Sequence, residues 1–253
     1  MIALSLVGIG SGNPDHLTLQ AIKTLEAADL ILLPRKGDEK SDLADLRRGI
    51  VAEVLQTAPK VVEFDYPVRD AKTPKYLDGV NTWHDALAKI WSGLIHDHSG
   101  SDAHVALMVW GDPSLYDSTL RIADRLKAQG LQIDVQVVPG ITSLQMLTAA
   151  HAIPLNDLGA PVIITTGRQL RDHGWPLGAD TVAVMLDGEC SFQHLSDAQQ
   201  IDIWWGGYVG MPQQVLRAGL LAEISDDIIQ TRAEARAENG WIMDIYLMRK
   251  RAD

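Results

Sequence analysis

Short apolar runs alternate with amphipathic stretches along the first half of the chain. In the stretches between the runs, apolar residues recur every three or four positions, as they do on one face of a helix. Strands joined by helical crossovers pair in parallel, so this half predicts an α/β domain built on a five-stranded parallel sheet. The expected strands are 2–7, 30–33, 61–66, 105–110 and 133–138, and the expected helices are 19–28, 41–54, 76–94 and 120–126.

The pattern changes after Pro139-Gly140. A helical stretch covers 142–150, and the apolar runs that follow are closer together with fewer helices between them. This spacing predicts a smaller C-terminal α/β domain with a mixed sheet. We expect the division near 139–158 and assign the two domains to 1–140 and 141–253. The expected strands of the second domain are 162–165, 182–186, 201–205 and 242–248.

Composition narrows the class of protein. The net charge of -11 over 253 residues argues against a nucleic-acid partner, because contacts to phosphate dominate that affinity. No apolar run approaches the roughly 20 residues of a membrane span, and no basic leader precedes the first strand. The single cysteine, Cys190, fits a reducing compartment, so we expect a cytoplasmic protein. The histidines lack ligand spacing, and we expect no metal site.

Basic residues concentrate in the segment 35–75, which has a net charge of +1 (nine Lys and Arg against eight Asp and Glu) in a chain that is otherwise acidic. Two interpretations remain open for this segment. It can be an ordinary solvated surface of mixed charge, or it can be a local binding site for a polyanionic small molecule.

A glycine-rich turn, Gly8-Ile9-Gly10-Ser11-Gly12, follows the first strand, and Thr18 can cap the helix after it. The turn is close to the dinucleotide fingerprint, but Asn13 stands where that fingerprint needs its third glycine. The second strand also ends at Pro34 instead of at an acid. A nicotinamide-dependent oxidoreductase is therefore an alternative that the motif itself disfavours.

Two more turns follow predicted parallel strands: Trp110-Gly111-Asp112-Pro113-Ser114-Leu115 after the fourth strand and Pro139-Gly140-Ile141-Thr142-Ser143 after the fifth. Each is a common turn when taken alone. Open α/β sheets bind ligands at the carboxyl ends of their strands, so three such turns together predict a ligand site.

The three turns in this order, with segments 152–155, 182–185 and 212–219, resemble the tetrapyrrole methylase family over the whole chain. The resemblance implies methyl transfer from S-adenosylmethionine to ring carbons of cobalamin and sirohaem precursors. It also implies a homodimer, with cofactor and substrate between the two domains of each chain. Two positions depart from the family pattern. Ser11 stands where family members usually have a proline, and Trp110 stands where they usually have a small residue. The cofactor-binding residues implied are Ser11, Trp110, Gly111, Asp112, Leu115, Thr142, Ser143, Met185, Tyr208 and Gly210.

Segments 33–37, 42–47, 64–67 and 240–244 resemble the branch of this family that methylates precorrin-5 at C1 and releases its acetyl group as acetate. The substrate is then a polycarboxylate tetrapyrrole, and we expect Arg35 and Lys36 to bind its carboxylates. Loss of acetate needs a general base and donors for the developing oxyanion. The catalytic candidates are Tyr66, Asp70 and His16, with Asp15 and His84 as further nominations, and each of these side chains also has an ordinary structural interpretation.

Other functions remain open at this point. Another precorrin or uroporphyrinogen C-methyltransferase would methylate without releasing acetate. A family member that acts on ribosomal RNA or on a translation factor is disfavoured by the negative charge. A ligand-binding module without catalysis would bind the cofactor and turn over no tetrapyrrole.

Overall fold

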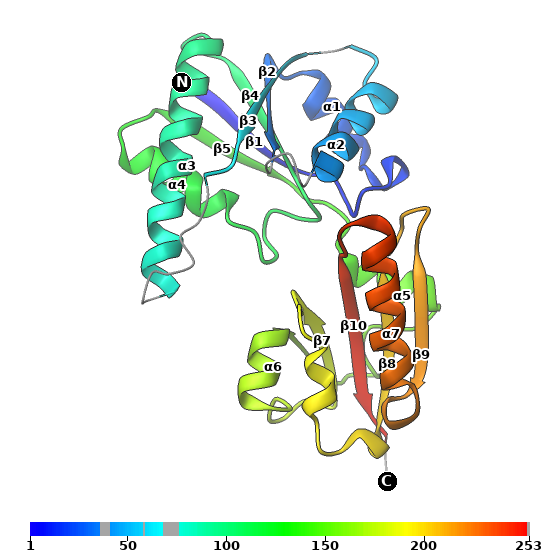
Figure 1. The fold of residues 1–253 in the computed structure, drawn as a ribbon. Helices are drawn as coiled ribbons and strands as arrows, with labels where there is room; N and C mark the ends of the chain where they lie inside the picture. The colour runs from blue at the N-terminus through cyan, green and yellow to red at the C-terminus, as the bar shows by residue number, and fades with distance from the viewer. Residues whose placement is uncertain (36–40, 58, 68–75, 252–253) are drawn as a thin grey trace. The chain divides into compact units, whose positions relative to one another are not determined.

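The structure is a computed structural model that describes residues 1–35, 41–57, 59–67 and 76–251. The chain divides into two compact units, Met1–Thr142 and Ser143–Asp253, and each unit contains one five-stranded sheet (Figure 1). Two of the predicted site residues, Lys36 and Asp70, lie outside the described residues. No helix of the described part is both long and apolar enough to cross a membrane.

The sheet of the first unit is entirely parallel, as the sequence predicted, with the order β3-β2-β4-β1-β5. Its helices connect the strands as crossovers, and a short 3-10 turn, η1 (Pro14–His16), precedes the first helix (Figure 1). The strands are β1 (Ile2–Gly8), β2 (Leu30–Arg35), β3 (Lys60–Asp65), β4 (His104–Val109) and β5 (Ile133–Val138). The helices are α1 (Leu19–Glu26), α2 (Ser41–Val54), α3 (Tyr76–His98) and α4 (Thr119–Ala128).

Both faces of this sheet are covered, which explains why its strands are continuous apolar runs. Leu4 and Leu6 of β1 pack in a core cluster with Trp91 of α3. Val7, on the other face of β1, belongs to a second cluster with Leu25 of α1. Alternate side chains of one strand therefore fill two cores.

Thr18 starts α1 as the sequence predicted. Its side-chain oxygen accepts a hydrogen bond from the backbone nitrogen of Ala21 at 3.0 Å, which satisfies one of the unpaired N–H groups of the first turn. The cap fixes where the glycine-rich turn ends and the helix begins.

The second unit has a mixed sheet with the order β6-β7-β10-β8-β9, in which only β6 and β7 pair in parallel. A mixed sheet agrees with the sequence prediction. The strands are β6 (Val162–Thr166), β7 (Thr181–Met185), β8 (Ile201–Gly207), β9 (Val215–Leu220) and β10 (Asp244–Lys250). The helices are α5 (Ser143–His151), α6 (Gly167–His173) and α7 (Leu221–Asn239), with 3-10 turns η3 (Ser191–His194) and η4 (Ala198–Gln200).

Two helices and one strand of the second unit, α6, α7 and β9, were not predicted. The strand β9 and the helix α7 lie in a region that the apolar pattern left without assigned elements. Among the residues of α7 only Leu221, Ile228 and Thr231 are buried, so the helix shows almost no apolar stripe. Gly240, with φ +74, ends α7 and turns the chain toward β10.

Candidate functional site

The turns after β1, β4 and β5 meet at a junction made of three glycines, Gly8, Gly111 and Gly140. A Cβ atom on Gly140 would lie 2.1 Å from the carbonyl oxygen of Gly111, and one on Gly8 would lie 2.6 Å from the nitrogen of Gly140. Neither position leaves room for any side chain. The three strand ends therefore approach one another backbone to backbone, which only glycine permits.

Hydrogen bonds join the first two turns across this glycine junction. The nitrogen of Gly111 donates to the carbonyl oxygen of Gly10 at 2.8 Å, and the nitrogen of Ile9 donates to the carbonyl oxygen of Val109 at 2.9 Å. Gly10 and Gly111 both have positive φ, +76 and +67, which glycine adopts without strain. Ser11, a predicted cofactor residue, is buried beside them.

The departure from the dinucleotide fingerprint has a local structural reason. The side-chain oxygen of Asn13 accepts a hydrogen bond from the nitrogen of Asp15 at 2.9 Å, and Pro14 then begins the turn η1. Asn13 and Pro14 thus build a short 3-10 turn where a dinucleotide-binding protein continues directly into its helix.

Asp112 connects the second turn with the third. Its Oδ2 accepts a hydrogen bond from the nitrogen of Gly140 at 2.9 Å, and its Oδ1 accepts one from the nitrogen of Ser114 at 2.8 Å. Burial alone would raise the pKa of Asp112, but the hydrogen bonds from Ser114 and Gly140 outweigh it and lower that pKa. The carboxylate is therefore ionised at neutral pH and holds the junction together.

The remaining candidates of the first unit surround the junction along the chain. Trp110 and Leu115 are half-buried in the turn after β4, and Thr142 is buried in the turn after β5. Ser143 is the first residue of α5, at the start of the second unit.

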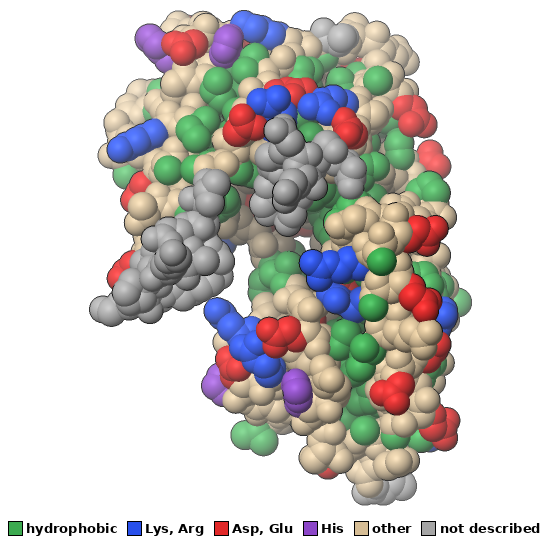
Figure 2. Space-filling model, in the orientation of Figure 1, with side chains coloured by type: hydrophobic (Ala, Val, Ile, Leu, Met, Phe, Trp, Pro, Cys, Tyr) green, Lys and Arg blue, Asp and Glu red, His purple; other side chains and the backbone are tan. Residues whose placement is uncertain are grey.

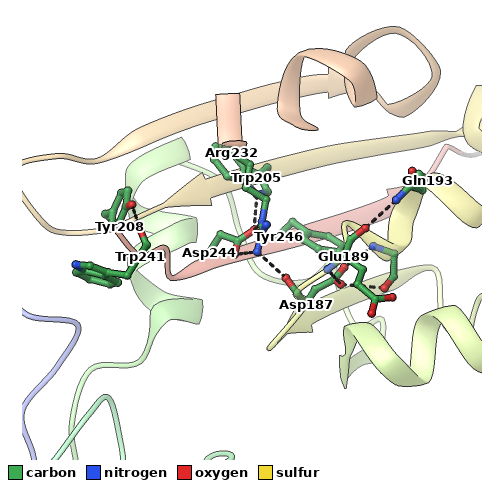
Figure 3. Close-up of polar contacts among 10 residues, drawn as sticks. Asp187, Glu189, Gln193, Trp205, Tyr208, Arg232, Trp241, Asp244 and Tyr246 are labelled. Atoms are coloured by element: carbon green, nitrogen blue, oxygen red, sulfur yellow. Dashed lines mark hydrogen bonds and ion pairs between the residues drawn. The ribbon is translucent and has the colours of Figure 1, made fainter. Parts of the chain in front are cut away.

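The candidates of the second unit follow β7 and β8. Met185 ends β7 and is half-buried. Tyr208 follows β8 with its side chain buried, and its hydroxyl donates a hydrogen bond shared between the carbonyl oxygens of Ala235, at 3.0 Å, and Trp241 (Figure 3). The phenol of Tyr208 is thus already hydrogen-bonded within the second unit. The nitrogen of Gly210 donates to the side-chain oxygen of Gln214 at 2.8 Å.

Backbone strain marks three of these turns. Tyr116, Leu186 and Tyr208 have φ of +50, +54 and +50, which costs a residue with a side chain about 1 kcal/mol or more. They follow β4, β7 and β8, next to the predicted cofactor residues. Strain of this kind concentrates at ligand sites, because a fold keeps it only where the surrounding structure imposes it.

Sequence reasoning missed a buried polar network around Asp187, the residue two places after Met185 (Figure 3). Its Oδ2 accepts hydrogen bonds from the hydroxyl of Tyr246 and from the nitrogen of Ser191, both at 2.6 Å. Its Oδ1 accepts from the nitrogen of Glu189 at 3.0 Å. Burial and the nearby Asp187 raise the pKa of Tyr246 well above its ordinary value, so the phenol stays protonated and donates.

A buried ion pair lies beside this network. Nε of Arg232 is 2.9 Å from Oδ2 of Asp244, and Nε1 of Trp205 donates to the same oxygen at 3.0 Å. Nη2 of Arg232 also donates to the carbonyl oxygen of Asp187 at 3.1 Å. These contacts tie the turn after β7 to α7, β8 and β10 (Figure 3). No single residue type in the sequence predicted this arrangement.

Arg35, the predicted substrate residue that the structure describes, is paired within its own unit. Its Nη2 is 3.0 Å from Oδ2 of Asp65, and its Nε is 3.6 Å from Oε2 of Glu63. The neighbouring Arg48 also pairs with Glu63, at 2.6 Å. On the face drawn in Figure 2, Lys and Arg side chains lie beside acidic ones.

The catalytic candidates Tyr66 and His84 lie close to a common aromatic side chain. The ring centroids of Tyr66 and Trp83 are 5.7 Å apart, and those of Trp83 and His84 are 5.6 Å apart. Burial raises the pKa of Tyr66, and the nearby Arg47 offsets only part of this. Burial also lowers the pKa of His84, with Arg125 and other neighbours contributing, so the imidazole is neutral at pH 7.

His16 lies in η1, and its Cβ would be 2.9 Å from a Cβ built on Gly10. Burial lowers the pKa of His16 against the opposing effect of Asp15. The buried Nδ1 of His16 and Nε2 of His84 have no hydrogen-bond partner among the described residues. In the described part of the chain, no group of His, Cys, Asp and Glu side chains is arranged to hold a metal ion.

A sequence model of the family "Tetrapyrrole (Corrin/Porphyrin) Methylases" matches residues 3–225, and the chain belongs to this family. The predicted family and the predicted two-sheet fold are thereby confirmed.

Individual relatives agree with the family. The precorrin-6A synthase [deacetylating] of Sinorhizobium sp is 48% identical over 255 residues, which cover 100% of this chain and 97% of the relative. Among solved structures, a protein from Corynebacterium diphtheriae described as related to cobalamin synthesis (CobF) matches with a TM-score of 0.84 and 38% identity over 100% of both chains. The uroporphyrin-III C-methyl transferase of Thermus thermophilus, solved with S-adenyl homocysteine, shares the fold, with a TM-score of 0.60 and 18% identity over 97% of this chain and 96% of that one.

Proposed function

We propose that this chain is a precorrin-6A synthase of the deacetylating type. It transfers a methyl group from S-adenosylmethionine to C1 of precorrin-5 and releases the acetyl group of that substrate as acetate. The observation that carries the proposal is the 48% identity to the Sinorhizobium enzyme along the whole chain. The matched region spans the whole chain, so it contains the turns after β1, β4 and β5 as well as the elements of the second unit.

The proposed binding of S-adenosylmethionine is supported by the chemistry of the glycine junction. Gly8, Gly111 and Gly140 bring three turns close together backbone to backbone, and the hydroxyls of Ser11 and Thr142 belong to the same turns. Peptide and hydroxyl groups suit the carboxylate, ammonium and ribose groups of this cofactor. When bound, S-adenosylmethionine supplies an electrophilic methyl group.

The other predicted cofactor residues are proposed on the same basis. Asp112 orders the junction, and Trp110 and Leu115 of the same turn are half-buried apolar side chains that can exclude water from the ligand. Met185 of the second unit, also half-buried, is proposed as a cofactor contact from the family resemblance alone. Methyl transfer to carbon needs a dry, well-aligned site more than it needs an acid or a base. Ser143, Tyr208 and Gly210 stay predicted cofactor contacts.

Release of acetate needs acid–base groups that methyl transfer does not need, because water must attack the acetyl carbonyl. The raised pKa of Tyr66 keeps its phenol protonated at neutral pH, which suits a donor to the oxygen that gains negative charge. The lowered pKa of His16 keeps its imidazole neutral, which suits a base that accepts a proton from water. We propose these two roles, with Asp70 as a further catalytic candidate.

The test is an incubation of the purified protein with precorrin-5 and S-adenosylmethionine that carries a deuterated methyl group. The expected product has lost the acetyl group and gained one labelled methyl group, and acetate appears in equal amount. A parallel incubation without S-adenosylmethionine separates acetate release from methyl transfer.

A product that gains the methyl group and keeps the acetyl group would contradict the proposal. It would assign the chain to another precorrin or uroporphyrinogen C-methyltransferase step. An unchanged substrate would also contradict it. Homodimer formation and a cytoplasmic location stay predictions, which sedimentation equilibrium and cell fractionation can check.

A further inference from the structure

Arg47 is a buried cation in the first unit. It lies on α2, and only 8% of its surface is exposed. Its Nε donates to the carbonyl oxygen of Met108 at 3.3 Å, and its Nη1 donates to that of Leu43 at 3.1 Å. A guanidinium has five N–H donors, so these two bonds leave most of its capacity unused. Among the residues that the structure describes, no carboxylate forms an ion pair with Arg47.

Two neighbouring arginines differ from Arg47 in this respect. Arg35 pairs with Asp65 and Glu63, and Arg48 pairs with Glu63. Both paired side chains are more than one-third exposed, so water also solvates their charge. Arg47 has lost most of its water, and no side chain of the described residues supplies an anion in contact with it. A buried charge of this kind opposes folding, and a protein keeps one chiefly where function requires it.

The surroundings of Arg47 belong to the predicted site. Its guanidinium carbon lies 6.0 Å from the ring centroid of Trp110, the predicted cofactor residue after β4. Met108, whose carbonyl it binds, is near the carboxyl end of β4. Arg47 therefore lies at the edge of the parallel sheet where α/β proteins bind their ligands.

Two side chains influence the charge of Arg47 without neutralising it by contact. Burial is the main influence on the pKa of Arg47 and lowers it, whereas Tyr66 and Asp117 oppose this effect. Asp117 acts on Arg47 only at a distance: its Oδ1 accepts a hydrogen bond from the nitrogen of Thr119 at 2.6 Å at the start of α4, and no hydrogen bond or ion pair joins it to Arg47 among the described contacts. Tyr66 has a raised pKa and stays neutral. Within the described part of the chain, Arg47 has no ion-pair partner, which leaves its charge available to an anionic ligand.

We propose that Arg47 binds a carboxylate of the tetrapyrrole substrate and is a specificity-determining residue of this enzyme. The inference rests on the proposed function, because precorrin-5 supplies the polycarboxylate. The planar guanidinium fork matches a carboxylate with two parallel hydrogen bonds, and the buried setting strengthens that pairing.

The experiment compares Arg47→Met with the wild type, and uses Arg48→Met on the same helix as the control. Methionine keeps an unbranched chain and removes the buried charge. We expect the KM for precorrin-5 to rise about 30-fold or more, because a fully desolvated charge pair is lost. The Kd for S-adenosylmethionine should stay at its wild-type value. The Tm of the ligand-free protein should stay equal or rise, because no unpaired charge remains buried. Arg48→Met should leave the KM unchanged.

An unchanged KM in Arg47→Met would overturn the inference. A lower Tm together with weaker binding of S-adenosylmethionine would also overturn it, because Arg47 would then be a structural residue. If Arg47→Met does not fold, Arg47→Lys decides the question. This variant keeps the positive charge and loses the planar guanidinium that donates two parallel hydrogen bonds. Its KM for precorrin-5 should rise about tenfold. A wild-type KM in that variant would count against the inference.

Binding of uroporphyrin separates this inference from the proposed function. This porphyrin octacarboxylate is stable, and its binding is followed by its own fluorescence without any turnover. If the wild type binds uroporphyrin but does not convert precorrin-5, the proposed function fails. Loss of that binding in Arg47→Met would still support the role of Arg47, and equal binding would overturn it. A wild type that neither binds uroporphyrin nor converts precorrin-5 overturns both proposals.

Discussion

The Oδ2 of Asp112 and the backbone nitrogen of Gly140 are 2.9 Å apart and hydrogen-bonded, although 28 positions separate them in the sequence. A side chain from the turn after β4 thereby holds the turn after β5. The same carboxylate accepts a hydrogen bond from the nitrogen of Ser114 at 2.8 Å. The geometry of the glycine junction depends on this one ionised group.

Asp112→Asn should lower the free energy of unfolding at pH 7 by about 1–2 kcal/mol, because an amide cannot replace both charge-assisted hydrogen bonds. The pKa of Asp112 is lowered in the folded state, so its stabilisation is present above the ordinary value of 3.8 and is lost as the pH falls below that value toward the lowered one. Urea unfolding at several pH values checks this. A difference between variant and wild type that stays constant from pH 7 to acid would contradict the assignment.

Gly140→Ala should lower the free energy of unfolding by about 2–3 kcal/mol and weaken binding of S-adenosylmethionine, because the new Cβ would meet the carbonyl oxygen of Gly111 at 2.1 Å. Gly49→Ala in α2 is the matched control. A Cβ at Gly49 has no neighbour within 4 Å, and alanine should stabilise the helix by about 0.5–1 kcal/mol. Calorimetry measures both effects. Equal behaviour of the two variants would show that the junction is not closely packed.

Tyr246→Phe should destabilise the chain by about 1.5–3 kcal/mol, because the buried Oδ2 of Asp187 loses the hydrogen bond that the Tyr246 hydroxyl donates at 2.6 Å. In a double-mutant cycle with Asp187→Asn, the two effects should not add, since both variants remove the same bond. Urea unfolding of the four proteins gives the coupling. Simple additivity would mean that the hydroxyl and the carboxylate act independently.

Leu186→Gly should raise the free energy of unfolding by about 1 kcal/mol, because Leu186 has φ +54 and 67% of its surface is exposed. Leu177→Gly is the comparison, since Leu177 is 97% exposed and is not among the residues with positive φ. Glycine there should lower stability slightly by freeing the unfolded chain. Thermal unfolding distinguishes the two variants. A Tm shift of the same sign in both would contradict the claim that the backbone of Leu186 is strained.

Tyr66→Phe should slow acetate release about 100-fold and leave the Kd for S-adenosylmethionine unchanged, because it removes a proposed oxyanion donor and little volume. Single-turnover kinetics with precorrin-5 measure the step directly. Normal turnover would exclude Tyr66 from catalysis.

The central strands of the first sheet, β1, β2 and β4, were predictable because they are buried on both faces and are therefore nearly continuous apolar runs. The edge strands β3 and β5 are partly exposed and carry polar residues, and only their apolar positions indicated them. The same reasoning failed for α7 and β9. The residues of α7 are charged on most sides, and β9 is an edge strand that carries Arg217 in its middle. Tertiary packing, which a local pattern does not record, decides such elements.

The candidate site likewise has parts that the sequence predicts and parts that it does not. The turns of the glycine junction could be found from residue spacing, because turn chemistry is local. The bond between Asp187 and Tyr246 could not, since 59 positions separate the two residues. The burial of Arg47 without an ion pair to any described residue is likewise a property of the folded chain, since its neighbour Arg48 is the same kind of residue in the sequence and is paired with Glu63.

The place of β10 in the second sheet has a consequence for synthesis on the ribosome. This strand pairs with both β7 and β8, yet it is the last of the five strands to be translated. All five strands of the first sheet, in contrast, precede Thr142. A nascent chain that stops before Asp244 therefore carries a complete first sheet beside two strand pairs, β6-β7 and β8-β9, with open edges where β10 belongs. Such edges are templates for pairing with other chains, so the interval before β10 emerges is when this protein most needs a chaperone.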